Sequence, residues 1–222
     1  MRSSPGPARF ELIIFDCDGV LVDSETLSCA CLMAQFAADG IVMDLDTVFE
    51  KFLGRSFAAV AAYYQARGRV MPADFAAQLR VRVRTAFAAS LQTVAGVEEV
   101  LHNLTTQYCL ASSSEPERVE FSLACTGLAA QFAGRVFTTS MVARGKPAPD
   151  LFLHAARVMH AAPARTLVVE DSISGVQAAK AAGMVAWGFV GASHYAASDG
   201  RAMLTAAGAD RVFARMADFW QG

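Results

Sequence analysis

Two pairs of acidic residues follow apolar segments of the chain and could bind a cation together. Asp16 and Asp18 come at the end of the apolar run 12–15, and Glu170 and Asp171 come directly after the run 167–169. Carboxylates crowded at the end of a buried strand repel one another unless they share a proton or a cation. A turn or a helix cap would explain one of the first two aspartates but not both. Because oxygen-only ligand sets suit Mg²⁺, the sequence predicts a magnesium site here.

Two further features suit the binding of a phosphate group. The serines 112–114 come at the point where a strand ends and a helix begins, and a helix N-terminus offers backbone N–H groups to an anion. Ser114 and Glu117 have the spacing of a capping box at that helix. Lys146 is followed by prolines at 147 and 149, which hold it in place, so it could neutralise a phosphoryl group in transfer.

Short apolar segments alternating with helix-like segments must position these residues. Strands are expected at 12–16, 108–112, 136–138, 167–170 and 184–189, which is typical of a parallel sheet with helical crossovers. Pro149 suits the first turn of a helix, and Gly183 suits the left-handed residue after one. The carboxyl edge of such a sheet is where ligands bind.

The stretch between the first two strands is too long for an ordinary crossover. It predicts helices at 25–38, 45–52, 57–67 and 73–90. The sequence therefore predicts an α/β fold: a doubly wound, Rossmann-like parallel-sheet core formed by residues 1–22 and 92–222, with an inserted α-helical cap domain at 23–91.

Composition excludes several classes of protein. Apolar residues make up 54% of the chain and charged residues 18%, which excludes disorder, and the apolar stretches are too short to span a membrane. A net charge of −2 provides no basic surface for nucleic acid, and the N-terminus lacks a secretory signal. Five cysteines in apolar segments are typical of a reduced protein. We expect a cytoplasmic monomer, or a weak homodimer, that binds neither nucleic acid nor membrane.

Four motifs in this order resemble those of the haloacid dehalogenase superfamily, in its phosphatase and β-phosphoglucomutase-like branch with a helical cap. They are Asp16-Cys17-Asp18-Gly19-Val20, Ala111-Ser112-Ser113, Gly145-Lys146-Pro147 and Glu170-Asp171-Ser172-Ile173-Ser174-Gly175. The resemblance implies a Mg²⁺-dependent enzyme that acts on a small phosphorylated metabolite, a sugar phosphate or a related polyol phosphate, through an aspartyl phosphate.

The resemblance also implies a role for each motif residue. Asp16 would be the nucleophile and Asp18 the general acid and base. Mg²⁺ would be bound by the Asp16 carboxylate, the Asp18 backbone carbonyl and Asp171, with Glu170 as a direct or outer ligand. Ser112 and Lys146 would hold the phosphoryl oxygens, and Ser113 would contact the substrate.

A loop in the predicted cap bears on the choice between hydrolase and mutase. Residues Gly54, Arg55 and Ser56 resemble the substrate-selecting loop of the β-phosphoglucomutase group. That mutase has a histidine where this chain has Ser28, and an arginine that grips the second phosphate where this chain has Phe57. Arg55, two residues earlier, could substitute for that arginine, but a phenylalanine cannot bind a dianion, so a phosphatase is favoured over the mutase.

Other members of the superfamily fit less well. Dehalogenases lack the second acid of the first motif, and phosphonate cleavage uses a cap lysine, whereas Lys51 is as easily explained as a surface residue. A catalytically silent binding or regulatory module remains an alternative, although no motif acid is missing. His194, in the loop after the last expected strand, could line the entrance to the site, but a place on a surface loop is favoured.

Overall fold

The computed structural model describes residues 10–55, 57–196 and 199–220. The chain forms two compact units, which we call the core unit (residues 1–23 and 92–222) and the helical unit (residues 24–91). Each unit is described by itself. That the helical unit acts as a cap stays a prediction.

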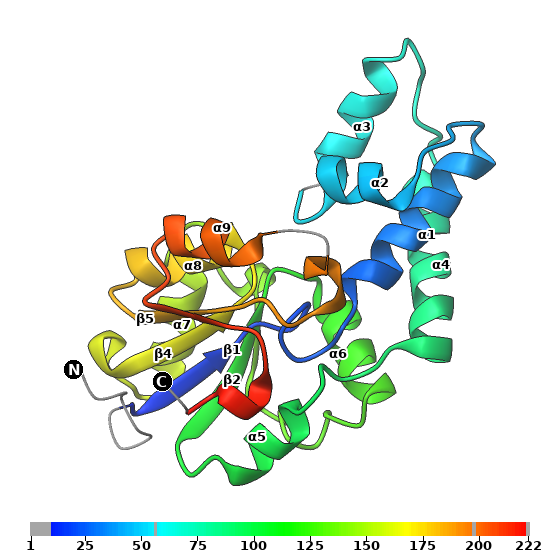
Figure 1. The fold of residues 1–222 in the computed structure, drawn as a ribbon. Coiled ribbons are helices and arrows are strands. Elements are labelled where there is room, and N and C mark those ends of the chain that lie inside the picture. Colours follow the sequence, from blue (N-terminus) through cyan, green and yellow to red (C-terminus); the bar gives the residue numbers. More distant parts are fainter. Residues whose placement is uncertain (1–9, 56, 197–198, 221–222) are drawn as a thin grey trace. The chain divides into compact units, whose positions relative to one another are not determined.

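A six-stranded parallel sheet organises the core unit, with the strand order β3-β2-β1-β4-β5-β6 (Figure 1). The central strands are buried on both faces, which explains why they read as continuous apolar runs in the sequence. The sixth strand was not expected from the sequence. The strands are β1 (Leu12–Phe15), β2 (Gln107–Ser112), β3 (Val136–Thr138), β4 (Thr166–Glu170), β5 (Val185–Phe189) and β6 (Arg211–Phe213).

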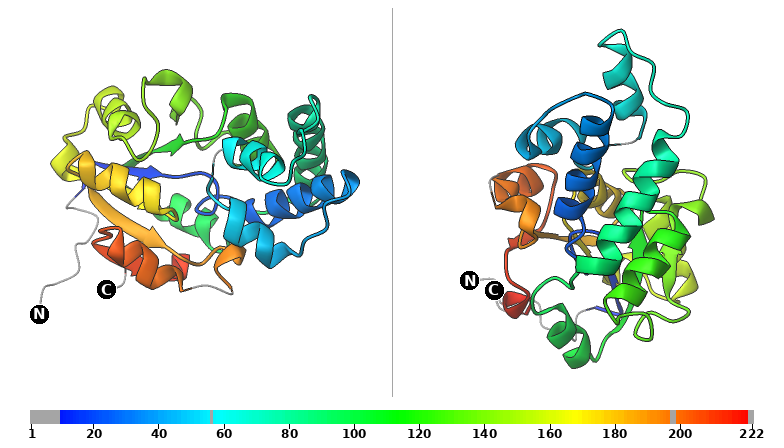
Figure 2. Two further views of the ribbon diagram at one scale, coloured as in Figure 1. Left: turned by 90° about the horizontal axis from the view of Figure 1, so that it is seen from above. Right: turned by 90° about the vertical axis from the view of Figure 1, so that its right-hand side faces the viewer.

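Helices cover both faces of this sheet, as Figures 1 and 2 show. On one face the side chains of Leu12 and Ile14 form a hydrophobic cluster with residues of α7, α8 and α9. On the other face Phe15 and Trp187 pack against Phe219, beside α5. This arrangement confirms the doubly wound α/β core. The helices of the core unit are α5 (Val97–Asn103), α6 (Pro116–Cys125), α7 (Asp150–Val158), α8 (Ile173–Ala181) and α9 (Gly200–Ala206).

Of the predicted helix-boundary residues Pro149 and Gly183, one has the expected place and the other does not. Gly183 adopts the left-handed conformation expected after α8, with φ of 73°. Pro149 precedes α7 as its N-cap residue and does not lie in the first turn of that helix. The five cysteines are free thiols, as expected.

The helical unit has a hydrophobic core of its own. Its helices are α1 (Glu25–Ala38), α2 (Leu45–Phe52), α3 (Phe57–Gln65) and α4 (Phe75–Ser90). The first two begin and end where the sequence predicts. Helix α3 ends two residues earlier than predicted, because the chain up to Gly68 forms turns with hydrogen bonds between residues three apart. Helix α4 begins two residues later than predicted, after a turn that starts at Pro72.

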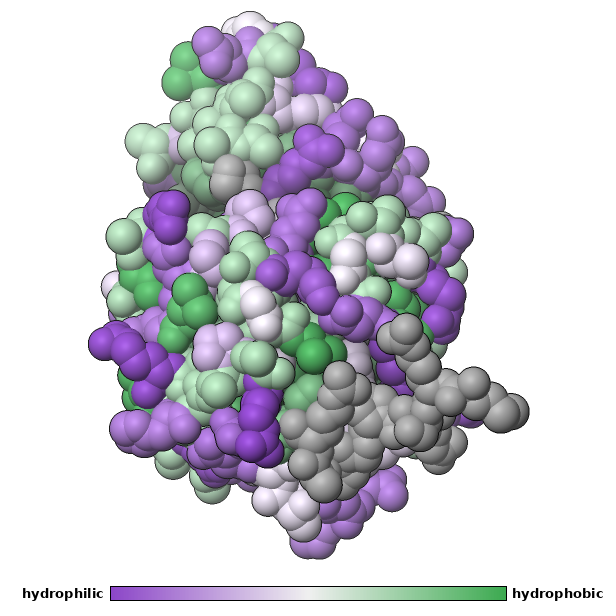
Figure 3. Space-filling view, turned by 90° about the vertical axis from the view of Figure 1, so that its left-hand side faces the viewer, coloured by the Kyte–Doolittle hydropathy of each residue, from purple (hydrophilic) through white to green (hydrophobic). Residues whose placement is uncertain are grey.

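No helix within the described ranges is long and apolar enough to cross a membrane. On the part of the core unit's surface seen in Figure 3, hydrophobic and hydrophilic residues are interspersed.

The aromatic cluster of the helical unit provides a test of its stability. Phe36 is fully buried, and its ring contacts those of Phe52, Tyr63, Tyr64 and Phe75. We expect Phe36→Ala to lower the free energy of unfolding by about 3–5 kcal/mol, because the cavity adds to the lost transfer free energy.

The matched control is Phe57→Ala, since Phe57 also contacts Phe75 but is 40% exposed. Urea unfolding followed by circular dichroism measures both, and the Phe57 variant should lose roughly 1 kcal/mol or less. Equal losses in the two variants would contradict a core centred on Phe36.

Candidate active site

Three of the four predicted acids meet at the carboxyl edge of the sheet. Asp16 follows β1 directly, Glu170 is the last residue of β4, and Asp171 comes next; β1 and β4 are paired neighbours. All three residues are buried, and each offers one carboxylate oxygen within 4.8 Å of those of the other two. The expected convergence therefore occurs for three of the four acids, and the donors that they offer are oxygens only.

Lys146 is the cation at the centre of this cluster. Its Nζ donates to Asp16 Oδ1 at 2.5 Å, to Glu170 Oε1 at 2.5 Å and to the Ala111 carbonyl at 3.0 Å, and the side chain is 3% exposed. An ammonium has three donors, so this one is fully satisfied. Burial by itself would lower the pKa of Lys146, but the two carboxylates outweigh it and raise that pKa, so the lysine stays charged.

Glu170 is held on both of its oxygens. Oε1 accepts from Lys146, and Oε2 accepts from the backbone N–H of Ser172 at 3.0 Å and from its hydroxyl at 2.8 Å. A Cβ on Gly175 would lie 1.8 Å from the Glu170 carboxyl carbon. Only glycine leaves room for the carboxylate there, which gives this motif glycine a physical reason.

Asp18 lies beside this cluster and is held by two partners. Its Oδ2 accepts from the Ser114 hydroxyl at 2.7 Å, and its Oδ1 accepts from Arg118 Nη2 at 3.1 Å. The predicted capping box is therefore wrong: α6 begins at Pro116 without a side-chain cap, because the Ser114 hydroxyl bonds the carboxylate instead. Sequence reasoning missed Arg118, whose only signal is its place in the first helical turn after β2.

The serines after β2 differ in exposure. Ser112 is buried, and its oxygen accepts from the backbone N–H of Ser114 at 3.0 Å, which leaves its own O–H free to donate. Ser113 is exposed, and its backbone carbonyl accepts from Thr139. Ser112 therefore lies at the same sheet edge as the acids with a donor to offer.

His194 is buried, so the expectation of a surface residue was wrong. Its side chain is 3% exposed, and Nε2 lies 3.5 Å from Asp171 Oδ2. Burial lowers the pKa of His194 to about 4, against the opposing effect of the Asp23 carboxylate, so the ring is neutral at pH 7. The polar loop around His194 offered no signal of this burial in the sequence.

The predicted residues of the loop after α2 belong to the helical unit. Gly54 and Arg55 are both exposed, and Gly54 has a left-handed φ of 66°. Ser56 lies outside the described residues. Contact of this loop with a substrate stays a prediction.

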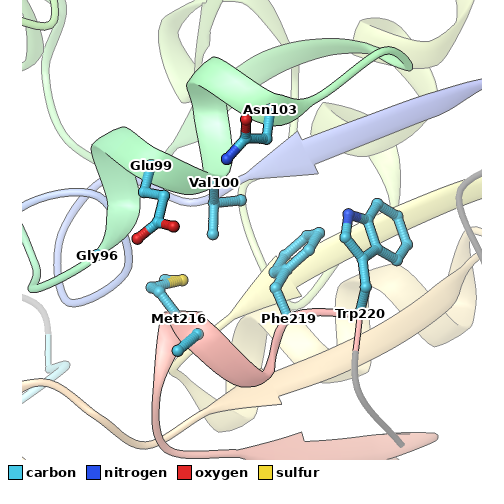
Figure 4. A pocket seen from close by; sticks show the side chains of 8 residues that line it. Gly96, Glu99, Val100, Asn103, Met216, Phe219 and Trp220 are labelled. Carbon is cyan, nitrogen blue, oxygen red and sulfur yellow. The ribbon is translucent and has the colours of Figure 1, made fainter.

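A separate groove of about 240 Å³ lies between α5 and the turn at Met216–Asp218 (Figure 4). Its lining is mostly apolar and includes Val100, Phe219 and Trp220. None of the acids described above lines it, so it is not a candidate for their chemistry.

Burial raises the pKa of Asp16 well above its usual value, with smaller contributions from Glu170 and Asp18, while Lys146 opposes the shift. Ionised Asp16 therefore costs stability without a further cation. Protonation of Asp16 therefore stabilises the folded chain. That stabilisation is fully present below about pH 4, the usual carboxyl pKa, and is lost as pH rises through the raised pKa of Asp16 in the folded state.

We therefore expect Asp16→Asn to be more stable than the native chain at pH 7 in the presence of a chelator, because the amide is neutral but keeps an oxygen for Lys146. The difference should vanish below about pH 4. Urea unfolding from pH 4 to 8 measures it, and addition of Mg²⁺ should narrow the gap. A constant difference at all pH values would argue against a costly Asp16 charge.

Comparisons with known proteins agree with this geometry. Residues 10–183 match the profile of the family described as haloacid dehalogenase-like hydrolase. The chain is 29% identical to 6-phosphogluconate phosphatase of Escherichia coli over 84% of this chain and 86% of that protein. It is 28% identical to fructose-1-phosphate phosphatase of the same organism, over 79% of this chain and 94% of that one.

A similar solved structure is that of a haloacid dehalogenase family hydrolase from Deinococcus radiodurans, which holds bound phosphate and sodium. It is 34% identical, with a TM-score of 0.81 over 96% of this chain and 94% of that chain. The sequence profile and the fold thus indicate the same family. This chain belongs to the haloacid dehalogenase-like hydrolases.

Proposed function

We propose that the protein is a Mg²⁺-dependent phosphatase that hydrolyses a small sugar phosphate or polyol phosphate through a phosphorylated Asp16. The observation that carries the proposal is the buried Asp16 carboxylate, fixed by Lys146 beside Glu170 and Asp171 at the carboxyl edge of the sheet. The two relatives named as phosphatases of 6-phosphogluconate and fructose 1-phosphate support the class of substrate.

The charges of the site fit a divalent cation. Four formal negative charges, on Asp16, Asp18, Glu170 and Asp171, face two positive charges, on Lys146 and Arg118, so an excess of two remains. An oxygen-only donor set suits Mg²⁺, which when bound would shield a phosphate from the carboxylates around it.

We assign the metal to the carboxylates of Asp16 and Asp171 and to the backbone carbonyl of Asp18. Glu170 is assigned to the outer shell, because both of its oxygens already accept hydrogen bonds from Lys146 and Ser172. Its task is then to hold Lys146 in place.

The residues divide the reaction into two displacements. The Asp16 carboxylate attacks phosphorus and the bond to the leaving oxygen breaks. Asp18, which must enter this step protonated, gives that oxygen its proton. Asp18 then takes a proton from water, whose oxygen attacks phosphorus and frees Asp16 and inorganic phosphate. Ser112 donates to the phosphoryl oxygens in both steps. Lys146, whose three donors are already taken, attracts those oxygens through its charge and donates to one of them only by giving up a present partner. Ser114 and Arg118 orient Asp18 for its part.

A mutase is the weaker candidate. It needs a cation to hold the second phosphate of its intermediate, and Phe57, which is 40% exposed, supplies none, so this task would fall to Arg55, two residues earlier. A silent binding module is weaker still, because the four acids and Lys146 are all present, and Asp16, Asp18 and Glu170 are hydrogen-bonded. We also retain the expectation of a cytoplasmic protein that is monomeric or weakly dimeric and binds neither nucleic acid nor membrane.

The proposed function is tested by phosphate release from a panel of sugar and polyol phosphates with added Mg²⁺. Asp16→Asn should lower the rate on the best substrate at least roughly a thousandfold, as expected when a covalent nucleophile is removed. Asp46→Asn, an exposed aspartate of α2, should match the native rate. Phosphate release that survives in the Asp16 variant would overturn the mechanism.

The loop after α2 provides a separate test of substrate contact. We expect Arg55→Ala to raise KM more than it lowers kcat, because a binding cation remote from the reacting atoms acts mainly on affinity. The control is Arg80→Ala, an exposed arginine of α4. Native KM in both variants would remove Arg55 from the substrate site.

A further inference from the structure

The loop after β5 brings two residues against Asp171, although it belongs to none of the four motifs. His194 faces the Asp171 side chain, and the Tyr195 hydroxyl donates to the Asp171 backbone carbonyl. The ring centroids of His194 and Tyr195 lie 4.2 Å apart, so the two side chains pack against each other. Asp171 is thus contacted both at its carboxylate and at its backbone by one short segment.

The His194 ring is oriented by what surrounds it. Nε2 lies 3.5 Å from Asp171 Oδ2, while Nδ1 is buried with no hydrogen-bond partner among the described residues. A proton on Nε2 is favoured, because the other tautomer would point a lone pair at a carboxylate. The separation is long for a hydrogen bond, so the N–H acts mainly through its electrostatic attraction to that carboxylate oxygen.

The opposite side of this carboxylate is closed by the first motif. A Cβ on Gly19, whose φ is 77°, would lie 1.9 Å from Asp171 Oδ2 and 3.1 Å from His194 Cε1. Asp171 Oδ2 is therefore confined between the Gly19 backbone and the His194 ring. The confinement restricts the rotation of the Asp171 carboxylate.

The loop itself is fastened at a second point. The backbone N–H and the hydroxyl of Ser193 both donate to Asp23 Oδ1, at 3.1 and 2.8 Å. The Tyr195 ring packs so closely on Gly200 that a Cβ there would lie 2.2 Å from it. These contacts fix where His194 and Tyr195 present their polar atoms.

We propose that Ser193–Tyr195 is a positioning element for the metal-binding carboxylate, which we call the Asp171 clasp. His194 holds Oδ2 so that the other Asp171 oxygen is presented to the cation, and Tyr195 fixes the backbone from which that side chain extends. Partners of this kind around metal ligands orient the ligand and raise its affinity for the ion. The inference rests on the proposed Mg²⁺ site.

Metal binding without substrate tests the clasp separately from catalysis. Mn²⁺ is the probe, and its binding to the full chain is followed by electron paramagnetic resonance. We expect His194→Leu to weaken Mn²⁺ binding by roughly 10-fold or more, the scale for loss of such a partner. His194→Gln, which keeps an N–H near the position of Nε2, should stay within about threefold of the native affinity. His102→Leu, which removes an exposed histidine of α5, should bind as the native chain does.

Tyr195→Phe supplies a variant that keeps the packing of the ring and loses only the hydroxyl, and it should also weaken Mn²⁺ binding. A residue that merely fills space would lower thermal stability in these variants and leave their Mn²⁺ affinity unchanged, which would overturn the inference. Equal weakening by His194→Leu and His194→Gln would also overturn it. If the native chain bound no Mn²⁺, the proposed metal site itself would fall.

Discussion

The buried ammonium of Lys146 lies between Asp16 and Glu170, which end two neighbouring strands of one sheet. Its three donors are satisfied by two carboxylates and a backbone carbonyl, so it cannot leave without exposing two buried charges to each other. The lysine compensates only part of the negative charge gathered there. This partial compensation stabilises the cluster of acids and leaves an excess of negative charge that suits the proposed divalent cation.

The surrounding structure follows from the need to bring these groups together without strain. Parallel strands buried on both faces carry apolar residues up to their carboxyl ends and acids immediately beyond them. The glycines at 19 and 175 are required because carboxylates of Asp171 and Glu170 occupy the space of their side chains. The motifs therefore supply both the acids and the glycines that leave space for them.

Several side chains acquire their place only from contacts between distant segments. Ser114 has the spacing of a helix cap, yet its hydroxyl bonds Asp18, which lies 96 residues earlier in the chain. His194 reads as part of a polar loop, yet its ring is buried beside Asp171. Local sequence rules fail at these positions because a charged partner from another loop competes better than the local backbone.

The sequence by itself determined the alternating strands and helices, the helical insertion and the two acid pairs, since apolar periodicity and charge at strand ends are local properties. It also indicated Lys146 and the serines after β2 through their neighbours in the chain. Only the tertiary structure decided that Glu170 has both oxygens occupied, that Arg118 holds Asp18, and that His194 and Tyr195 contact Asp171. These outcomes depend on how loops from separate strands meet at one edge of the sheet, and no periodicity within a single segment records that meeting.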